Sequence, residues 1–487
     1  MSVNSFLRPV TSRYGKSNLI IDGYIMSHNK VVKDVHYWSC VNKHTVNCKS
    51  TLTSRIVGEE HFLIKEMSSH NHAPEPDRVD ELNLRNSLKQ SAVQTNDTPG
   101  KIIRENLSSL PSSSTTSIPN KNALRQIIQR ARKKNMPEEP TCLSEINIPD
   151  DLKEVNGVNF LGRDHEYGNN KRLLLFATES NLRRLSESDM WFVDGTFQTC
   201  PALFTQFFSI HCIVGTGDCK RIVPLVYGFL DSKTEESYVT FFSQLKEYSA
   251  EFNIELNPGQ IMSDFEQAIL KAIRIEFPNT IQSGCLFHLG QNIWRKIQAC
   301  GPSARYGADS NFAVQMRCYV ALAYLPAEDI PNIFRQYKDT LFPEEAEDVT
   351  RYFEEYYVLG RLISRNIDDK IQVSRLQPLF PPSLWSIERN NHSRLPRTQN
   401  TVEAWHRRWN SLLDNKRLGL YGCIRKIIEE QKVTEHKIEK ILGNLPQTPP
   451  KKKKKVADNA ISAILARKNT MGPLEFIRAL ALSTRIY

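Results

Sequence analysis

Four side chains near the start of the chain have the types and order of a metal site. Cys40, Cys48, His70 and His72 form the pattern C-x7-C-x21-H-x-H. Thiolate sulfur and imidazole nitrogen are donors that tetrahedral Zn²⁺ prefers, so this set predicts one structural zinc ion. The alternative interpretation is a pair of small buried cysteines accompanied by surface histidines.

Three further histidines are ligands by type in the same region. Nothing pairs them with a second donor at ligand spacing, so they rank below the first set. They are His36, His44 and His61.

Two aspartates later in the chain each end an apolar run. Asp194 closes MWFVD and Asp264 closes QIMSD. Both are expected at the carboxyl edges of strands in one sheet, where α/β folds place their chemistry. Carboxylate oxygens are the ligands that Mg²⁺ and Mn²⁺ prefer, so the two acids could share a metal ion. The alternative is that such residues only cap or form turns.

The elements around these aspartates predict an α/β layer with one mixed sheet. β-Branched and aromatic runs favour strands, and apolar residues three and four apart favour helices. Their order is βββαβαβα, and interleaved helices require crossover packing. The expected strands cover 190–197, 205–215, 220–230, 259–266 and 280–288, and the expected helices cover 236–252, 267–277 and 291–299.

The chain has 487 residues and a formal net charge of +10, and that charge is concentrated in two segments. Residues 121–135 carry +6 and residues 448–487 carry +7, which leaves the other residues at −3. A Lys block flanked by prolines predicts a nuclear localisation signal or a phosphate-contacting tail, and the alternative is a solvated linker. That block comprises Lys451, Lys452, Lys453, Lys454 and Lys455. The basic helix-compatible segment predicts DNA contacts through Arg125, Arg130, Arg132, Lys133 and Lys134.

Composition excludes several classes of protein. With 40% hydrophobic and 24% charged residues the chain is neither wholly disordered nor collagenous. No apolar run reaches 18 residues and no secretory signal is evident, so we expect no membrane partner. Ten cysteines in 487 residues are too few for a disulfide scaffold. We therefore expect an intracellular protein whose cysteines are kept reduced in a cytosolic or nuclear compartment. The lysine block favours the nucleus.

The N-terminal pattern resembles the FLYWCH-type zinc finger. The matching elements are Trp-x-Cys at Trp38 and Cys40, Cys-x-(Ala/Ser) at Cys48 and Ser50, and the final His-x-His. The resemblance implies a small β-rich module over 18–76 that depends on Zn²⁺ for its fold and binds DNA or a protein partner.

The later pattern resembles the catalytic domain of Mutator-like element (MULE) transposases. WFVDGTF, SDFEQAI and CLFHLGQNIW occur in the family's order, followed by RTQNTVEAWH. The resemblance implies a ribonuclease-H-like DDE fold in which Glu403 is the third acid. It implies active-site neighbours at Cys285, His288, Asn400 and His406. A Cys-x2-His pair alone has too few ligands for a zinc site.

The implied activity is metal-dependent DNA transposition. Asp194, Asp264 and Glu403 would hold two Mg²⁺ or Mn²⁺ ions for an in-line phosphodiester displacement. The expected partners are the transposon ends and target DNA, with a homo-oligomer by analogy and no small-molecule substrate. The alternative is a domesticated, non-catalytic nuclear DNA-binding protein that regulates transcription.

The expected architecture is multidomain, with an all-α insertion interrupting the α/β ribonuclease-H-like domain. A zinc finger occupies 18–76, followed by a flexible polar linker at 80–120 and a basic helical pre-catalytic region at 121–185. The expected catalytic parts are a transposase core at 186–300, a helical insertion at 301–394, the final catalytic-helix region at 395–440 and a basic tail at 446–487.

Overall fold

In the computed structural model the chain forms two compact units, Met1–Glu138 and Glu139–Tyr487. The structure describes residues 6–12, 15–65, 67–95, 97–110, 118–134, 137–367, 370–392, 395–396, 398–413, 418–443 and 452–484.

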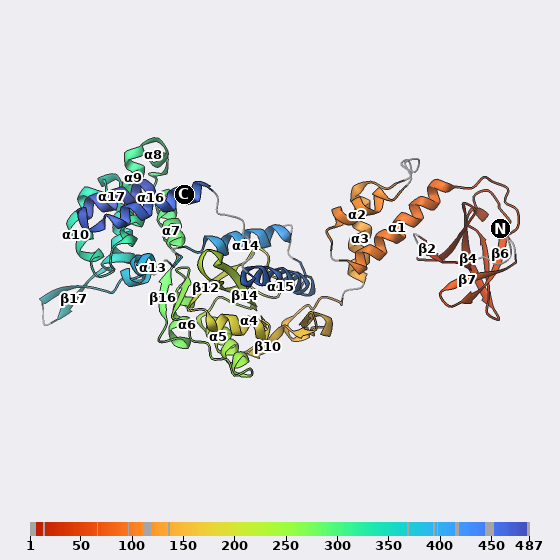
Figure 1. Ribbon diagram of the computed structural model, residues 1–487, viewed down its shortest axis with the longest axis horizontal. Helices are drawn as coiled ribbons and strands as arrows, with labels where there is room; N and C mark the ends of the chain where they lie inside the picture. Colours follow the sequence, from red (N-terminus) through yellow and green to blue (C-terminus); the bar gives the residue numbers. More distant parts are fainter. Residues whose placement is uncertain are drawn as a thin grey trace. The chain divides into compact units, whose positions relative to one another are not determined.

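The first unit begins with a seven-stranded antiparallel sheet (Figure 1). Its strands follow the order β1-β7-β6-β5-β4-β3-β2. Alternate side chains meet on one face, so Leu19, Met26, Trp38 and Leu63 form a small core. This sheet fits a small zinc finger. The strands are β1 (Phe6–Leu7), β2 (Val10–Thr11), β3 (Ser17–Ile21), β4 (Tyr24–Val32), β5 (Val35–Cys40), β6 (Thr51–Val57) and β7 (Glu60–Lys65).

Helices occupy much of the segment that composition marked as a flexible polar linker. α1 (Pro76–Gln94), α2 (Pro99–Ser108) and α3 (Lys121–Lys134) pack around a common apolar core. That core includes Leu84, Leu88, Ile103, Leu124 and Ile128. α1 buries apolar residues four apart, at Leu84, Leu88 and Ala92, while many of the Ser, Asn and Gln residues of these helices are exposed. The average composition of this segment is polar, so composition alone did not indicate the helices.

The second unit is built on a mixed seven-stranded sheet of order β10-β11-β14-β13-β12-β15-β16. The predicted run of five strands and three helices is confirmed in its order: β12 (Met190–Thr196), β13 (Gln206–Val214), β14 (Arg221–Leu230), α5 (Glu235–Ala250), β15 (Gln260–Ser263), α6 (Gln267–Glu276), β16 (Ile281–Gly284) and α7 (Leu286–Ala299). The preceding elements were not predicted: β8 (Glu154–Val155), β9 (Val158–Asn159), β10 (Leu161–Tyr167), β11 (Lys171–Phe176) and α4 (Glu179–Glu187).

Helices cover both faces of this sheet (Figure 1). Trp191 and Val193 of β12 face the core shared with α4, α5 and α6. Phe192, between them, packs on the opposite face against Val402 of α14 (Asn400–Leu412). Because strand side chains alternate, Asp194 lies on the α14 face. α15 (Leu420–Leu442) contacts β13 and β14.

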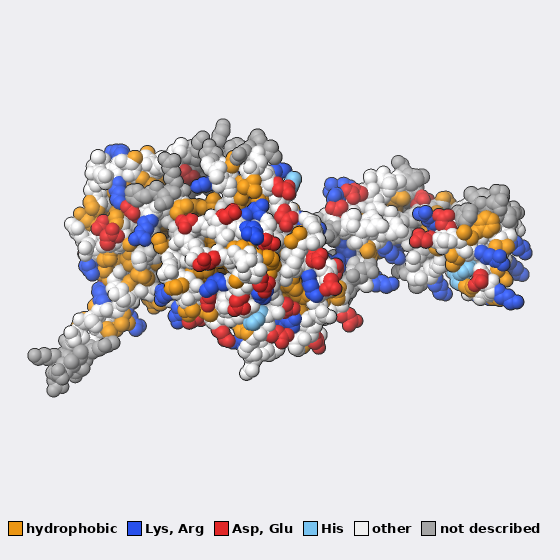
Figure 2. Space-filling model, turned by 60° about the horizontal axis from the view of Figure 1, so that its bottom comes forward, with side chains coloured by type: hydrophobic (Ala, Val, Ile, Leu, Met, Phe, Trp, Pro, Cys, Tyr) orange, Lys and Arg blue, Asp and Glu red, His pale blue; other side chains and the backbone are white. Residues whose placement is uncertain are grey.

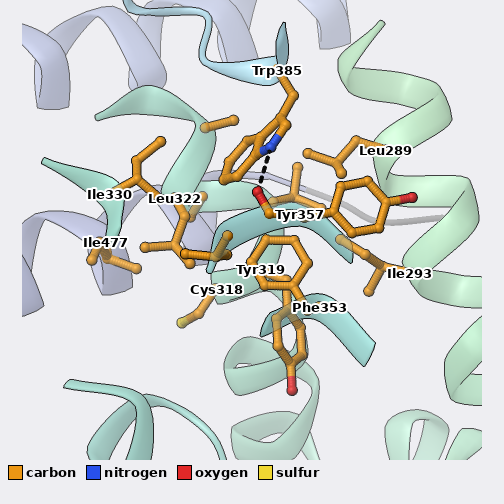
Figure 3. Close-up of a cluster of buried hydrophobic side chains, with 14 of the residues drawn as sticks. Leu289, Ile293, Cys318, Tyr319, Leu322, Ile330, Phe353, Tyr357, Trp385 and Ile477 are labelled. Carbon is orange, nitrogen blue, oxygen red and sulfur yellow. Dashed lines mark hydrogen bonds between the residues drawn. The ribbon is translucent and has the colours of Figure 1, made fainter. Parts of the chain in front are cut away.

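A second apolar core lies within the same unit (Figure 3). Trp385 donates from Nε1 to the carbonyl oxygen of Tyr357 at 3.1 Å, and Tyr319 stacks on Phe342. Its residues come in part from α8 (Ser303–Ala308), α9 (Ser310–Ala321), α10 (Ile330–Leu341), α11 (Glu347–Phe353) and α12 (Pro382–Trp385). The same stretch of the chain also contains α13 (Glu388–His392) and the hairpin of β17 (Leu362–Ile367) and β18 (Lys370–Arg375).

The segment expected to be a basic tail contributes to this core. α16 (Lys452–Ala466) and α17 (Pro473–Ser483) form, and α17 buries Phe476, Ile477 and Leu480. The five-lysine run led to the prediction of a basic tail, although the apolar residues after it have helical spacing. Lys451 lies outside the described residues, and Lys452 begins α16.

We expect Phe476→Ala to lower the free energy of unfolding by about 3 to 5 kcal/mol, because it empties a buried aromatic site. Urea unfolding of the full chain measures this loss. Leu482→Ala on the same helix is the matched control, because Leu482 is 67% exposed. Equal midpoints for the two variants would contradict the placement of α17 in the core.

Candidate metal centres and carboxylate site

The structure brings the four predicted zinc ligands of the first unit together. Cys40 Sγ lies 3.3 Å from His72 Nε2, and Cys48 Sγ lies 3.4 Å from His70 Nδ1. The two imidazole nitrogens are 3.3 Å apart, and all four donor atoms lie within 4.8 Å of one another. These separations and donor types suit tetrahedral Zn²⁺.

Neighbouring groups fix the orientation of the two histidine rings. His72 donates from Nδ1 to the carbonyl oxygen of Ala73 at 2.8 Å, which leaves Nε2 as the metal-binding atom. The Tyr24 ring stacks on His70 with centroids 3.7 Å apart, and its hydroxyl donates to the carbonyl oxygen of His72. The contact of Tyr24 with the histidine ligands was not predicted, because Tyr24 stands 46 positions before His70.

The three alternative histidines lie outside this cluster. His44 is exposed. His36 bonds to His28, whereas His61 is buried beside Trp38 and bonds to Ser54. Their environment therefore separates them from the four-ligand set.

The two aspartates of the second unit lie at the same level on neighbouring parallel strands. Phe192 of β12 is paired with Met262 of β15, and Asp194 and Asp264 each follow two residues later. Both acids line a cavity of about 380 Å³. Their shared position at the carboxyl edge follows from the parallel register.

Backbone groups orient both carboxylates. Asp194 Oδ1 accepts from the Gly195 N–H at 2.9 Å, and Asp264 Oδ1 accepts from the Glu266 N–H at 3.0 Å. Burial and the nearby charges of Asp264 and Glu403 raise the pKa of Asp194 to about 8. Among the residues that the structure describes, no Lys or Arg side chain forms an ion pair with Asp194.

Glu403 lies in the first turn of α14 and is directed toward a different pair of side chains. Its Oε1 is 3.8 Å from His288 Nε2. The donor atoms of Cys285, His288 and Glu403 all lie within 4.8 Å of one another. The three acids form no such set among the residues that the structure describes. Burial raises the pKa of Glu403 to about 7.

His406 connects Asp194 to a buried polar chain. Its Nε2 lies 3.6 Å from Asp194 Oδ2 and 3.2 Å from Ser209 Oγ, which in turn contacts His211 Nε2 at 2.9 Å. Burial lowers the pKa of His406 to about 3, so its ring is neutral at physiological pH. His406, which the family resemblance implies as an active-site neighbour, therefore lies beside Asp194 in the structure.

Gln399 links β12 and β15 to the segment that begins α14. This role was not predicted from the sequence. Its Nε2 donates to the carbonyl oxygens of Val193 at 3.3 Å and Met262 at 2.6 Å. Its backbone N–H donates to Cys285 Sγ at 3.2 Å. Asn400, which was expected beside the acids, is exposed as the first residue of α14. The only sequence signal for Gln399 is its place immediately before this helix.

The basic helix α3 has both exposed and internally bonded cations. Arg125, Arg130 and Lys134 are exposed. Arg132 instead donates to the backbone carbonyls of Ala92, Thr95 and Asp97. It therefore joins α3 to the end of α1. The side chain of Lys133 lies outside the described residues.

The raised pKa of Asp194 predicts that unfolding depends on pH. The folded chain keeps this acid protonated up to about pH 8, whereas the unfolded chain ionises it near 3.8. Without added divalent ions, stability should therefore fall as pH rises from about 4 to about 8. Urea midpoints across this range, compared with those of Asp194→Asn, measure the contribution. Identical pH profiles would contradict it.

Two family models match parts of the chain. Residues 190–292 match the MULE transposase domain, and residues 9–72 match the FLYWCH zinc finger domain. The first match contains Asp194, Asp264, Cys285 and His288, and the second contains all four zinc ligands. No curated protein matches the chain.

Proposed function

Because the chain carries a FLYWCH zinc finger domain and a MULE transposase domain, we propose that it is a DNA transposase. It would cleave phosphodiester bonds at transposon ends and transfer the strands with divalent metal ions. The observation that carries the proposal is that Asp194 and Asp264 lie at one level on neighbouring parallel strands and line the same cavity.

The carboxylate site suits Mg²⁺ or Mn²⁺. Asp194, Asp264 and Glu403 supply hard oxygen donors. Burial and the neighbouring Asp264 raise the pKa of Asp194, and a bound cation would stabilise its ionised form. Two bound divalent metal ions would supply activation of the attacking water or 3′-hydroxyl and stabilisation of the leaving oxygen. The residues of the chain would orient these donors: Gly195 and Glu266 fix the aspartates, and Gln399 fixes the strands.

The topology supports a ribonuclease-H-like assignment for this sheet. Three antiparallel strands, β14, β13 and β12, are followed by parallel β15 and β16, and α14 delivers Glu403 on the face of Asp194. We assign residues 301–394 as a helical insertion between the second and third acids. The C-terminal helices complete its core.

Nuclear DNA would be bound by several parts of the chain. The finger and the exposed cations Arg125, Arg130 and Lys134 are proposed DNA contacts. On the face shown in Figure 2, acidic and basic side chains are interspersed over the second unit. A metal-loaded site rather than a uniformly basic surface would therefore attract the scissile phosphate. A homo-oligomer would bring two ends together.

Among the residues that the structure describes, no helix has both the length and the apolar character needed to cross a lipid bilayer.

The direct test is a nicking assay on a labelled duplex that carries the sequences flanking the coding region. The proposal predicts Mg²⁺- or Mn²⁺-dependent products with a 3′-hydroxyl and none with Ca²⁺ alone. DNA binding without cleavage in any of these ions would favour the domesticated regulatory protein instead. Terminal inverted repeats and a target-site duplication around the gene would favour the transposase.

Neutralising Lys451, Lys452, Lys453, Lys454 and Lys455 should reduce nuclear entry or weaken the salt dependence of DNA binding. Each lost phosphate contact lowers the slope of log K against log salt by about 0.9. Metal-dependent cleavage of a short duplex should persist, since this run is separate in sequence from the carboxylate residues. Loss of cleavage by a folded variant would contradict that separation of roles.

A further inference from the structure

Three side chains beside the carboxylate site meet as a second set of metal donors. Cys285 ends the loop before α7, His288 lies in its first turn, and Glu403 comes from the first turn of α14. Their donor atoms lie within 4.8 Å of one another. The Cys-x2-His pair lacked a third ligand in the sequence, and the fold supplies it from 115 positions beyond His288.

Buried atoms in this cluster lack partners among the described residues. Glu403 Oε1 and His288 Nδ1 are both inaccessible to solvent and make no hydrogen bond. Leaving a buried polar atom unpaired is destabilising, and more so for a charged group. A cation between these donors would compensate the carboxylate.

The surroundings of Cys285 favour a metal-bound thiolate. The Gln399 N–H donates to its sulfur at 3.2 Å, and the backbone N–H groups of Phe287 and His288 also contact it. Such hydrogen bonds at a helix start stabilise a negative sulfur, and a bound cation deprotonates the thiol outright. Without a cation, burial raises the pKa of Cys285 to about 12.

We propose that Cys285, His288 and Glu403 bind one Zn²⁺ ion in addition to the zinc of the finger. One sulfur, one imidazole nitrogen and one carboxylate oxygen suit Zn²⁺ and Co²⁺, whereas Mg²⁺ avoids the first two. Three protein ligands leave the fourth tetrahedral position open. This site goes beyond the proposed function, and zinc can bind there whether or not the chain cleaves DNA. Because Glu403 is also a proposed ligand of the Mg²⁺ or Mn²⁺ ions, zinc at this site would compete with them for its carboxylate.

Metal analysis of the purified full chain tests the proposal. Protein saturated with Zn²⁺ and freed of excess should contain about two zinc ions per chain, and Cys285→Ala and His288→Gln should each contain about one fewer. Cys48→Ser should keep this second ion while losing that of the finger. With Co²⁺ in place of zinc, Cys48→Ser should show a thiolate-to-cobalt absorption band that is absent when Cys285→Ala is added.

Matched controls separate this site from folding defects and from the carboxylate site. Cys318→Ala removes another buried thiol of the same unit and should keep both zinc ions. Asp264→Asn should also keep both, even though it removes the proposed cleavage. Circular dichroism identifies variants that fail to fold, and His288→Gln serves if Cys285→Ala is one of them. A single zinc ion in the wild type, lost entirely with Cys48→Ser, would overturn the proposal.

Discussion

Asp194→Asn should lower the rate of metal-dependent strand cleavage by at least about 10³-fold while DNA binding persists. Asparagine keeps the size of the side chain and an oxygen for the Gly195 N–H, but it removes the negative charge that holds a divalent ion. Single-turnover nicking assays in Mg²⁺ and in Mn²⁺ measure the rate, and a gel-shift assay measures binding.

Asp189→Asn is the matched control for this substitution. Asp189 precedes β12 at the opposite end of the strand from Asp194 and is exposed. Its amide variant should cleave at the wild-type rate. Cleavage by Asp194→Asn at a comparable rate would remove Asp194 from the proposed chemistry.

The second large effect concerns the finger: Cys48→Ser should unfold the N-terminal sheet. Structural Zn²⁺ contributes roughly 10 to 16 kcal/mol of apparent binding free energy in small fingers, far more than the core of Leu19, Met26, Trp38 and Leu63 can replace. Zinc content should fall, and amide hydrogens of residues 15–65 should lose protection from exchange. Chelation of the wild type should have the same effect.

Cys142→Ser provides the comparison for the finger variant. Cys142 is a partly exposed thiol of the second unit, so its loss should leave zinc content and protection of the sheet unchanged. Protection in the second unit should remain in both variants. A Cys48→Ser protein with wild-type protection over 15–65 would exclude a structural role for the metal.

The order of elements around the aspartates could be predicted because each carries a clear local period. The runs at MWFVD and QIMSD show short β segments, and α5 shows its aromatic face. β10 and β11 were not predicted as strands. The residues of β10, LGRDHEY, are largely polar, and only the pairing of this segment with β11 makes it a strand. Strand pairing of that kind depends on residues distant in the sequence.

The site residues also separate into those that a local sequence pattern indicates and those whose role depends on distant segments. Zinc ligands and aspartates stand in recognisable patterns, so their types and spacing indicated them. The roles of Gln399, Tyr24 and the contact of Glu403 with His288 depend on which segments the fold brings together. The family motif indicates Asn400 and gives no role to Gln399, whereas the start of α14 exposes Asn400 and buries Gln399.

Asp194, Asp264 and Glu403 are proposed to hold divalent ions for phosphodiester chemistry, and binding of Mn²⁺ measures this property. Electron paramagnetic resonance can count free and bound Mn²⁺ at pH 8 in full chain that carries a single zinc ion, in the finger. We expect about two Mn²⁺ ions per wild-type chain, displaced by Mg²⁺, and a loss of that binding in Asp264→Asn. Equal Mn²⁺ uptake by wild type and Asp264→Asn, or none by either, would exclude these carboxylates as the metal ligands.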